Sequence, residues 1–288
     1  MNNILNIKRF GLVLRKDIME GWKRYTLMFL TMLGILTVGL IWTYYDFSIV
    51  NGETILHKQN RLNIEALGYL SFLFCIFGLI FSSTFMNPMN SKTKKISYLI
   101  NPSSSFEKYF SRWIIITVVY IILFFVAMWI ADTIRITFYS TFFSFYLYKV
   151  TAFVDLTQLI YMGDDLNSSG YLLPKSVFLS FLSIYFFFQS LLILGSTFWE
   201  KSTFIKTFTA IAVIVIVFVL VCRWTILLFY GEFDGFAKAI NILQPVKNID
   251  LNETAAAYKL SAAIFVFALI NWILAFFRFR ESEIIKRL

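Results

Sequence analysis

Apolar residues form long runs along this chain, and most charged residues lie in the segments between them. A helix needs about 20 consecutive apolar residues to cross the hydrocarbon core of a bilayer, where it satisfies its backbone polar groups internally. Six runs meet or approach that length: about 26–45, 66–86, 113–131, 176–198, 207–222 and 260–277. The pattern predicts an all-α integral membrane protein with six transmembrane helices in a single domain, 1–288.

The sequence does not fix where the helix of the fifth run ends. Arg223 interrupts it, but residues 224–230 are apolar again, so the helix is able to continue while the Arg223 side chain reaches toward the interface.

The segment 136–154 raises a second alternative, because it is long enough for a seventh span and Lys149 is its only charge. It mixes eight Phe and Tyr residues with several Ser and Thr residues, a composition typical of the membrane interface. We favour an amphipathic piece on the outer surface or an extension of the third helix, and keep the seventh span as the alternative.

The six spans divide the basic residues unevenly between two sides. Of the 26 Lys and Arg residues, 17 lie on the side of the N-terminus and 9 on the other side. Cytoplasmic segments carry the excess of positive charge in membrane proteins. We therefore expect both termini in the cytoplasm, with 132–175 and 223–259 as outer segments.

Composition agrees with a membrane location. The chain is 59% hydrophobic, 19% aromatic and only 15% charged, which leaves too little polar surface to solvate a soluble globule. The net charge of +9 comes from cations that flank apolar runs, so we expect the lipid bilayer and no nucleic acid as partner.

The usual signatures of catalysis are missing from the sequence. His57 is the sole histidine, Cys75 and Cys222 form no metal or redox motif, and no G-x-x-x-x-G-K-[ST] phosphate loop occurs. We therefore expect no catalytic, cofactor-binding or metal-binding residues in this chain. Polar residues within spans include Gln189, Ser190 and Asn271, which either line a path or bond between helices; we favour packing.

Residues 1–25 form a candidate amphipathic helix on the inner leaflet. Ile7, Phe10, Leu14 and Ile18 recur at three- and four-residue steps, and three basic pairs lie among them. The alternative is that these cations only orient the first span.

The segment 87–112 between the second and third spans is the most informative stretch. Pro102 interrupts any helix, and Ser104 and Glu107 have the spacing of a capping box. A helix should therefore begin near Ser105 and feed into the third span. Composition alone leaves it open whether this basic segment is a topology signal or a docking element.

Residues 98–112 resemble the L-P-x-S-x-x-E-K-x-x-x-R segment that follows the second span in membrane permeases of type-2 ATP-binding-cassette (ABC) exporters. The match is strongest at Pro102, Glu107, Lys108 and Arg112, and it departs from the family at Asn101. The six-span layout and the N-terminal amphipathic helix are similar to the same family. The resemblance implies a bacterial cytoplasmic (inner) membrane protein.

In that family two permease halves pair around a path, and each rests on a cytosolic ATPase through the helix between spans two and three. The resemblance therefore implies a second permease copy or paralogue, and a separate ABC ATPase that holds ATP and Mg²⁺. Lys94 to Ser105, including Lys95, would form the docking turn. Glu107 and Lys108 would pair with charges on the ATPase, and Arg112 would lie at the inner interface. The alternative function is a non-transporting scaffold or immunity subunit.

Overall fold

The computed structural model describes residues 6–45, 55–87, 96, 98, 100, 102–142, 153–154, 175–199, 203–230 and 251–285. All regular elements in these ranges are helices. They are α1 (Ile7–Tyr45), α2 (Ile55–Ser83), α4 (Ser105–Ile114), the π-helical turn η3 (Ile115–Val119), α5 (Tyr120–Phe142), α7 (Lys175–Phe198), α8 (Thr203–Tyr230) and α10 (Leu251–Ile285).

Six helical stretches in the described part of the chain are long and apolar enough to cross a membrane: Ile7–Tyr45, Leu62–Ser83, Ser105–Phe142, Phe178–Phe198, Phe204–Val221 and Tyr258–Ser282. Each contains or largely overlaps one predicted span. The chain is therefore a multi-pass membrane protein with an all-helical fold, as the hydrophobic pattern predicts.

The structure bears on two boundaries that the sequence leaves open. The third span continues without a break as α4, η3 and α5, so residues 136–142 extend that helix, while 143–152 lie outside the described residues. The fifth span likewise continues past Arg223 to Tyr230 as α8. An apolar helix tolerates one long basic side chain because the charged head can reach the interface.

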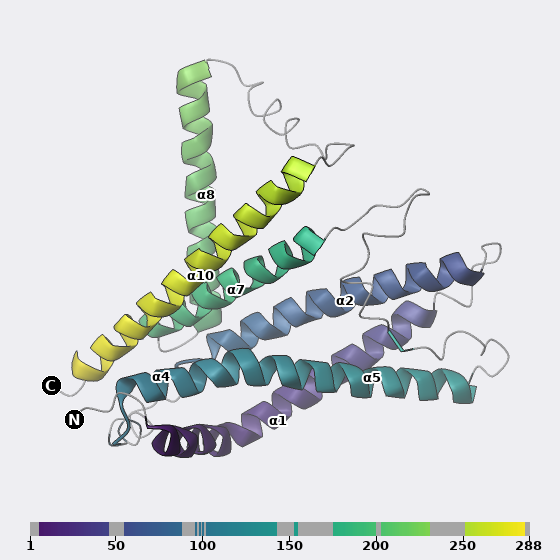
Figure 1. Ribbon diagram of the computed structural model, residues 1–288, viewed down its shortest axis with the longest axis horizontal. Coiled ribbons are helices and arrows are strands. Elements are labelled where there is room, and N and C mark those ends of the chain that lie inside the picture. Colours follow the sequence, from purple (N-terminus) through teal and green to yellow (C-terminus); the bar gives the residue numbers. More distant parts are fainter. Residues whose placement is uncertain are drawn as a thin grey trace.

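The bundle is built on contacts of α7 with α10, of α1 with α5, and of α2 with α7 (Figure 1). Close approach of α1 and α2 depends on Gly39, since any side chain there would collide with the Tyr69 ring. The Tyr69 hydroxyl donates a 2.7 Å hydrogen bond to the carbonyl oxygen of Ile35. A missing Cβ on one helix thus admits an aromatic ring from the next.

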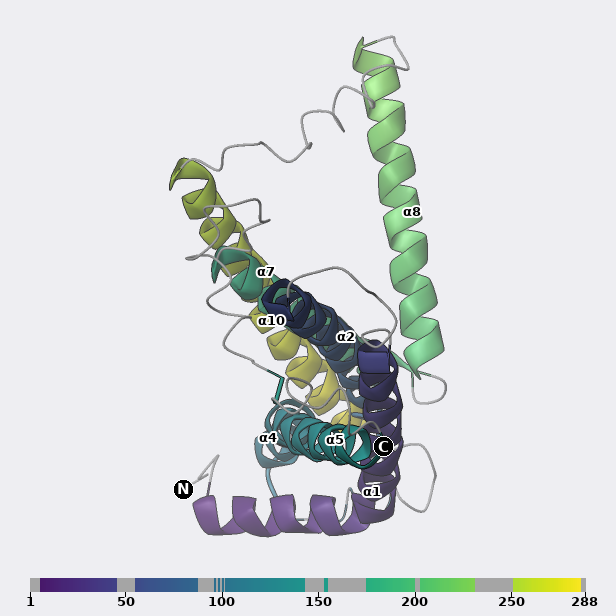
Figure 2. The same ribbon diagram turned by 90° about the vertical axis from the view of Figure 1, so that its right-hand side faces the viewer.

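Helix α8 differs from the rest because it stands apart along most of its length (Figures 1 and 2). It contacts α7 and α2, and a methyl group on Gly195 of α7 would overlap Thr207 of α8. Beyond that contact most of the described apolar side chains of α8, such as those of residues 213–217, are exposed. Such a surface is stable when hydrocarbon surrounds it, as in a bilayer.

The first part of α1 passes below α4, which it contacts, before α1 turns along the bundle (Figure 2). We call residues 7–25 of α1, which precede its apolar run, the N-terminal arm. The start of α1, the start of α4 and the end of α10 lie at the same end of the molecule (Figure 1). An even number of spans requires this, because each span reverses the side on which the chain emerges.

Candidate functional site

The start of α4 is fixed by the capping box that the sequence predicts. The Glu107 backbone N–H donates to Ser104 Oγ at 3.2 Å, and the Ser104 N–H donates to Glu107 Oε2 at 3.1 Å. Two backbone donors that a helix start leaves unpaired are satisfied in this way. The expected helix start near Ser105, after the break at Pro102, is confirmed.

Glu107 also ties α4 to the N-terminal arm. Arg9 donates to both carboxylate oxygens, from Nε to Oε2 at 2.7 Å and from Nη2 to Oε1 at 2.8 Å. The Asn6 backbone N–H donates to Oε1 at 2.8 Å. A two-pronged guanidinium bond is among the strongest side-chain contacts, so residues about 100 positions apart are held together.

The electrostatics of Glu107 follow from these contacts. The side chain is 0% exposed, and it precedes the apolar run that begins at Trp113. Burial raises the pKa of the Glu107 carboxyl, but the hydrogen bonds from Arg9, Asn6 and Ser104 outweigh it, so the pKa lies below its ordinary value. Glu107 is therefore a charged carboxylate at neutral pH.

A second polar contact joins α1, α4 and the end of α2. Ser111 Oγ donates to Asp17 Oδ2 at 2.6 Å, and Arg112 Nη2 lies 3.8 Å from Asp17 Oδ1. Arg112 Nη1 donates to the Phe85 carbonyl oxygen at 3.0 Å, beyond the end of α2. Asp17, Ser111 and Arg112 are all buried, so this contact positions three chain segments at once.

Lys108 lies on the inward side of α4 as well. It is 1% exposed, and its Nζ lies 5.3 Å from the centre of the Tyr98 ring, while Arg112 Cζ lies 4.4 Å from the same centre. The Tyr98 ring meets Phe279 of α10 with 6.2 Å between ring centres. Cation–π contacts of this kind link the segment before α4 to the last helix. We call the contacts of Glu107, Lys108, Ser111 and Arg112 the inner junction.

The inner junction changes how the predicted coupling residues are interpreted. Glu107, Lys108 and Arg112 are engaged within the chain, which favours the helix-cap interpretation of Glu107 over a direct bond to a partner.

The predicted coupling residues before Pro102 are only partly described. Lys94 and Lys95 lie outside the described residues. Ile96 and Ile100, which precede Pro102, are 57% and 74% exposed, so the chain itself does not cover these two apolar side chains.

Two contributors to the junction were missed from the sequence, Arg9 and Asp17. In the sequence Arg9 is one of several cations of the arm, and the one signal for Asp17 is that it is an acidic residue within a basic stretch. The residues of the predicted apolar stripe of the arm also lie in two different environments. Phe10 meets Phe110 of α4 with 5.6 Å between ring centres, whereas Ile7 is 81% exposed. Part of that stripe thus packs on the protein itself.

The predicted polar residues within the spans bond between helices. Asn271 Nδ2 of α10 donates to Ser190 Oγ of α7 at 3.1 Å. Gln189 Nε2 lies 3.5 Å from both the Ile116 carbonyl oxygen and Thr117 Oγ1, which belong to η3. A π-helical turn shifts backbone hydrogen bonding, and Gln189 lies beside this one. These contacts favour the packing interpretation.

A second charged cluster, the outer cluster, lies on α5 toward the opposite end of the third span. Arg135 Nε lies 2.7 Å from Asp132 Oδ1, and Asp132 Oδ2 accepts a 2.9 Å hydrogen bond from the Val154 N–H. Arg135 Cζ lies 3.9 Å from the centre of the Tyr44 ring. Asp132 begins the predicted outer segment 132–175, and it is buried in the structure.

Comparison with known protein families, curated proteins and solved structures finds no match to this chain. The inner junction and the six spans are therefore the basis for any functional proposal.

Proposed function

We propose that the chain is the membrane-spanning permease subunit of an ATP-driven ABC exporter, coupled to a separate cytosolic ATPase. The observation that carries this proposal is the inner junction. It joins α4, which is continuous with the third span, to the arm of α1. It also joins α4 to Phe85 after the end of α2 and to Tyr98 before Pro102. A force applied near Pro102 would reach two spans through the Arg9–Glu107 and Ser111–Asp17 contacts, in which both carboxylates are buried.

The physical basis of the proposal is the stiffness of the connection between α4 and α1. The α4 helix cannot tilt without breaking the Arg9–Glu107 bond or moving the arm with it. Because Ser111 and Arg112 bond Asp17 on the same helix, α1 is held at two positions about two turns apart. With two points of attachment, a rotation of α4 also rotates α1. With a single attachment, α1 could turn independently about that contact.

Within the proposal, the exposed residues before Pro102 form the docking surface. Ile96 and Ile100 face outward there, and the basic Lys94 and Lys95 precede them in sequence. The ATPase would bind ATP and Mg²⁺, and a second permease copy or paralogue would complete the path. Both termini and this segment would face the cytoplasm of a bacterial cell, as the distribution of basic residues favours.

Site-directed cross-linking tests the proposal. Cys75 and Cys222 are replaced by alanine, and a photoactivatable cross-linker is attached to Ile100→Cys in membranes of the native host. We expect a cross-link to a protein whose sequence contains a phosphate loop. The matched control is Trp129→Cys, which is 63% exposed on the far part of the third span and should give no such product.

A second measurement separates a transporter from a scaffold. The cross-linked ATPase is purified with and without the full chain, and its ATP hydrolysis is measured in liposomes. Stimulation by the chain supports the proposal. A partner without a phosphate loop, or an ATPase whose rate the chain leaves unchanged, would favour the non-transporting scaffold or immunity subunit.

A further inference from the structure

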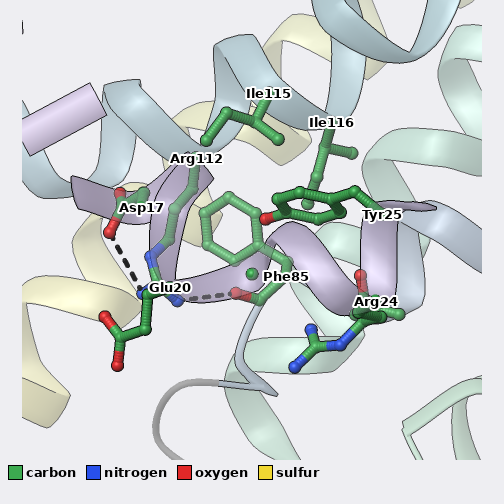
Figure 3. Close-up of a pocket in the computed structure, with 10 residues that line it drawn as sticks. Asp17, Glu20, Arg24, Tyr25, Phe85, Arg112, Ile115 and Ile116 are labelled. Atoms are coloured by element: carbon green, nitrogen blue, oxygen red, sulfur yellow. Dashed lines mark hydrogen bonds and ion pairs between the residues drawn. The ribbon is translucent and has the colours of Figure 1, made fainter. Parts of the chain in front are cut away.

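A small cavity of about 50 Å³ lies beside the inner junction (Figure 3). Residues 17–25 of α1 form one side of it, where the basic arm gives way to the apolar run that begins at Thr26. The end of α2 and the start of the third span form the other side. Its volume has room for a few water molecules or one ammonium group.

The inner wall of this cavity is occupied by charges that already have partners. Asp17 is held by Ser111 and faces Arg112, whose Nη1 bonds the Phe85 carbonyl oxygen. Arg112 is only 5% exposed, and its Nε is a buried donor without an acceptor among the described residues. This wall therefore presents both a carboxylate and an unused guanidinium donor.

Two further charged residues of opposite sign, Glu20 and Arg24, line the cavity. They are four residues apart on α1, a spacing that often gives an ion pair. No ion pair between them is found in the described part of the chain, and in the view of Figure 3 the two charged groups lie apart. The cavity lining therefore includes a carboxylate and a guanidinium that are not paired with each other.

Gly21 keeps this space open. The Tyr25 ring leans over Gly21, and a Cβ added there would come within 2.7 Å of the ring. The ring is held on its other side by Phe81, with 5.7 Å between ring centres. A side chain at position 21 would push the ring and alter the cavity.

The surroundings of the cavity are those of a membrane interface. Trp22 and Met19 are exposed next to it on α1, at the junction of basic and apolar sequence. Tryptophan is enriched where hydrocarbon meets the headgroup layer. A ligand that is abundant at this depth and carries both charges is a phospholipid headgroup.

We propose that this cavity binds the phosphoethanolamine headgroup of a phosphatidylethanolamine lipid, with its ammonium toward Glu20 and Asp17 and its phosphate toward Arg24. A primary ammonium offers three N–H donors to carboxylates, whereas the trimethylammonium of phosphatidylcholine offers none. A phosphatidylglycerol headgroup supplies no cation for Glu20. The proposal requires only that the spans lie in a membrane, and it does not depend on an ATPase partner.

Lipid exchange on the full chain tests the site. The purified, delipidated protein is incubated with vesicles of phosphatidylethanolamine, phosphatidylcholine and phosphatidylglycerol in equal amounts, and bound lipid is measured by mass spectrometry. We expect phosphatidylethanolamine to be enriched about threefold or more over its share in the vesicles. Glu20→Gln and Arg24→Gln should each remove that enrichment.

The control variant is Lys23→Gln, an exposed neighbour that does not line the cavity. It should leave the enrichment unchanged. Three results would overturn the proposal: equal binding of phosphatidylethanolamine and phosphatidylcholine, preferential binding of phosphatidylglycerol, or the same loss in Lys23→Gln. Free phosphoethanolamine distinguishes the two sources of the headgroup, because its binding without enrichment of the lipid would also overturn a lipid site.

Discussion

The inner junction and the outer cluster both bury charge, but they use it differently. At the inner junction Arg9 and Glu107 come from different helices, and the Arg9 side chain remains 38% exposed. In the outer cluster Asp132 and Arg135 lie three residues apart on one helix, and their side chains are only 5% and 0% exposed. The inner pair connects helices, whereas the outer pair is local and more deeply buried.

The two clusters nevertheless contact the same helix, α1. Arg9 and Asp17 belong to the arm of α1, and Tyr44, on which Arg135 stacks, lies near its other end. The first helix is thus attached to the third span at both of its ends. Burial thus determines how much stability is lost when a contact is removed, and the separation of the two residues along the sequence determines which segments the contact positions.

Arg135→Ala should give the largest effect, because it leaves the Asp132 carboxylate buried without its cation. Removing one partner of a buried pair costs about 3–5 kcal/mol. Unfolding of the detergent-purified chain, followed by tryptophan fluorescence, measures this loss. In the double variant Asp132→Ala with Arg135→Ala part of the stability should return, and a loss below about 1 kcal/mol in the single variant would contradict the buried pair.

Glu107→Gln should have a smaller effect, because Arg9 is partly exposed and water replaces some of the lost contact. We expect a loss of about 2 kcal/mol, typical of hydrogen bonds to a charged group. The same unfolding measurement applies, and an arm-to-α4 cross-link between cysteines at positions 10 and 110 reports separation of the two helices. An unchanged cross-link yield together with unchanged stability would argue against the junction.

The Glu107 contribution should also depend on pH with a defined sign. Its folded-state pKa is lowered, so the stabilisation is complete above the ordinary carboxyl pKa and is lost as pH falls through the lowered value. The stability difference between the wild type and Glu107→Gln should therefore be constant from about pH 7 to about pH 5 and shrink only in stronger acid. A difference that declines above pH 5 would show that the carboxylate lacks these partners.

Ser104→Ala tests the cap alone and should cost about 1 kcal/mol, because one backbone donor at the start of α4 loses its acceptor. Ser104→Asp should retain most of the stability, since aspartate also caps helices. Equal losses in both variants would show that the cap hydrogen bond is not what stabilises the helix start.

Glu281→Gln should have the smallest effect. The Arg278–Glu281 pair spans 3.0 Å, but its side chains are 45% and 58% exposed. An exposed pair contributes less than about 0.5 kcal/mol. A larger loss of stability would indicate that another part of the protein or a partner covers this end of α10. The difference in stability loss between an exposed pair and the buried Asp132–Arg135 pair would then be smaller than we expect.

Much of the fold is predictable because span length and hydrophobicity are local properties. Runs such as 26–45 and 260–277 have the length and composition that a bilayer requires, whatever their neighbours are. The capping box at Ser104 and Glu107 is equally local, since both residues belong to one helical turn. These features were correctly predicted for that reason.

The junction itself was harder to predict because its partners are far apart. The contact of Arg9 with Glu107 depends on how the arm crosses α4, and no periodicity within the arm selects Arg9 over its neighbouring cations. The same holds for Phe10, whose ring packs on Phe110 of α4. Asp132 can be buried because Val154 and Arg135 bond its carboxylate, and only folding brings Val154 to it.

Local sequence patterns are enough to predict that the chain is helical, that it has six apolar spans, and that α4 begins after Pro102. Those outcomes follow from hydrogen-bond satisfaction in lipid and from residue spacing within a few turns. The pairing of charges, the covered face of the arm and the position of the charged cavity depend instead on how the helices pack. The physical reason is that ion pairs and cavities depend on distances between segments, which the order of residues along the chain does not fix.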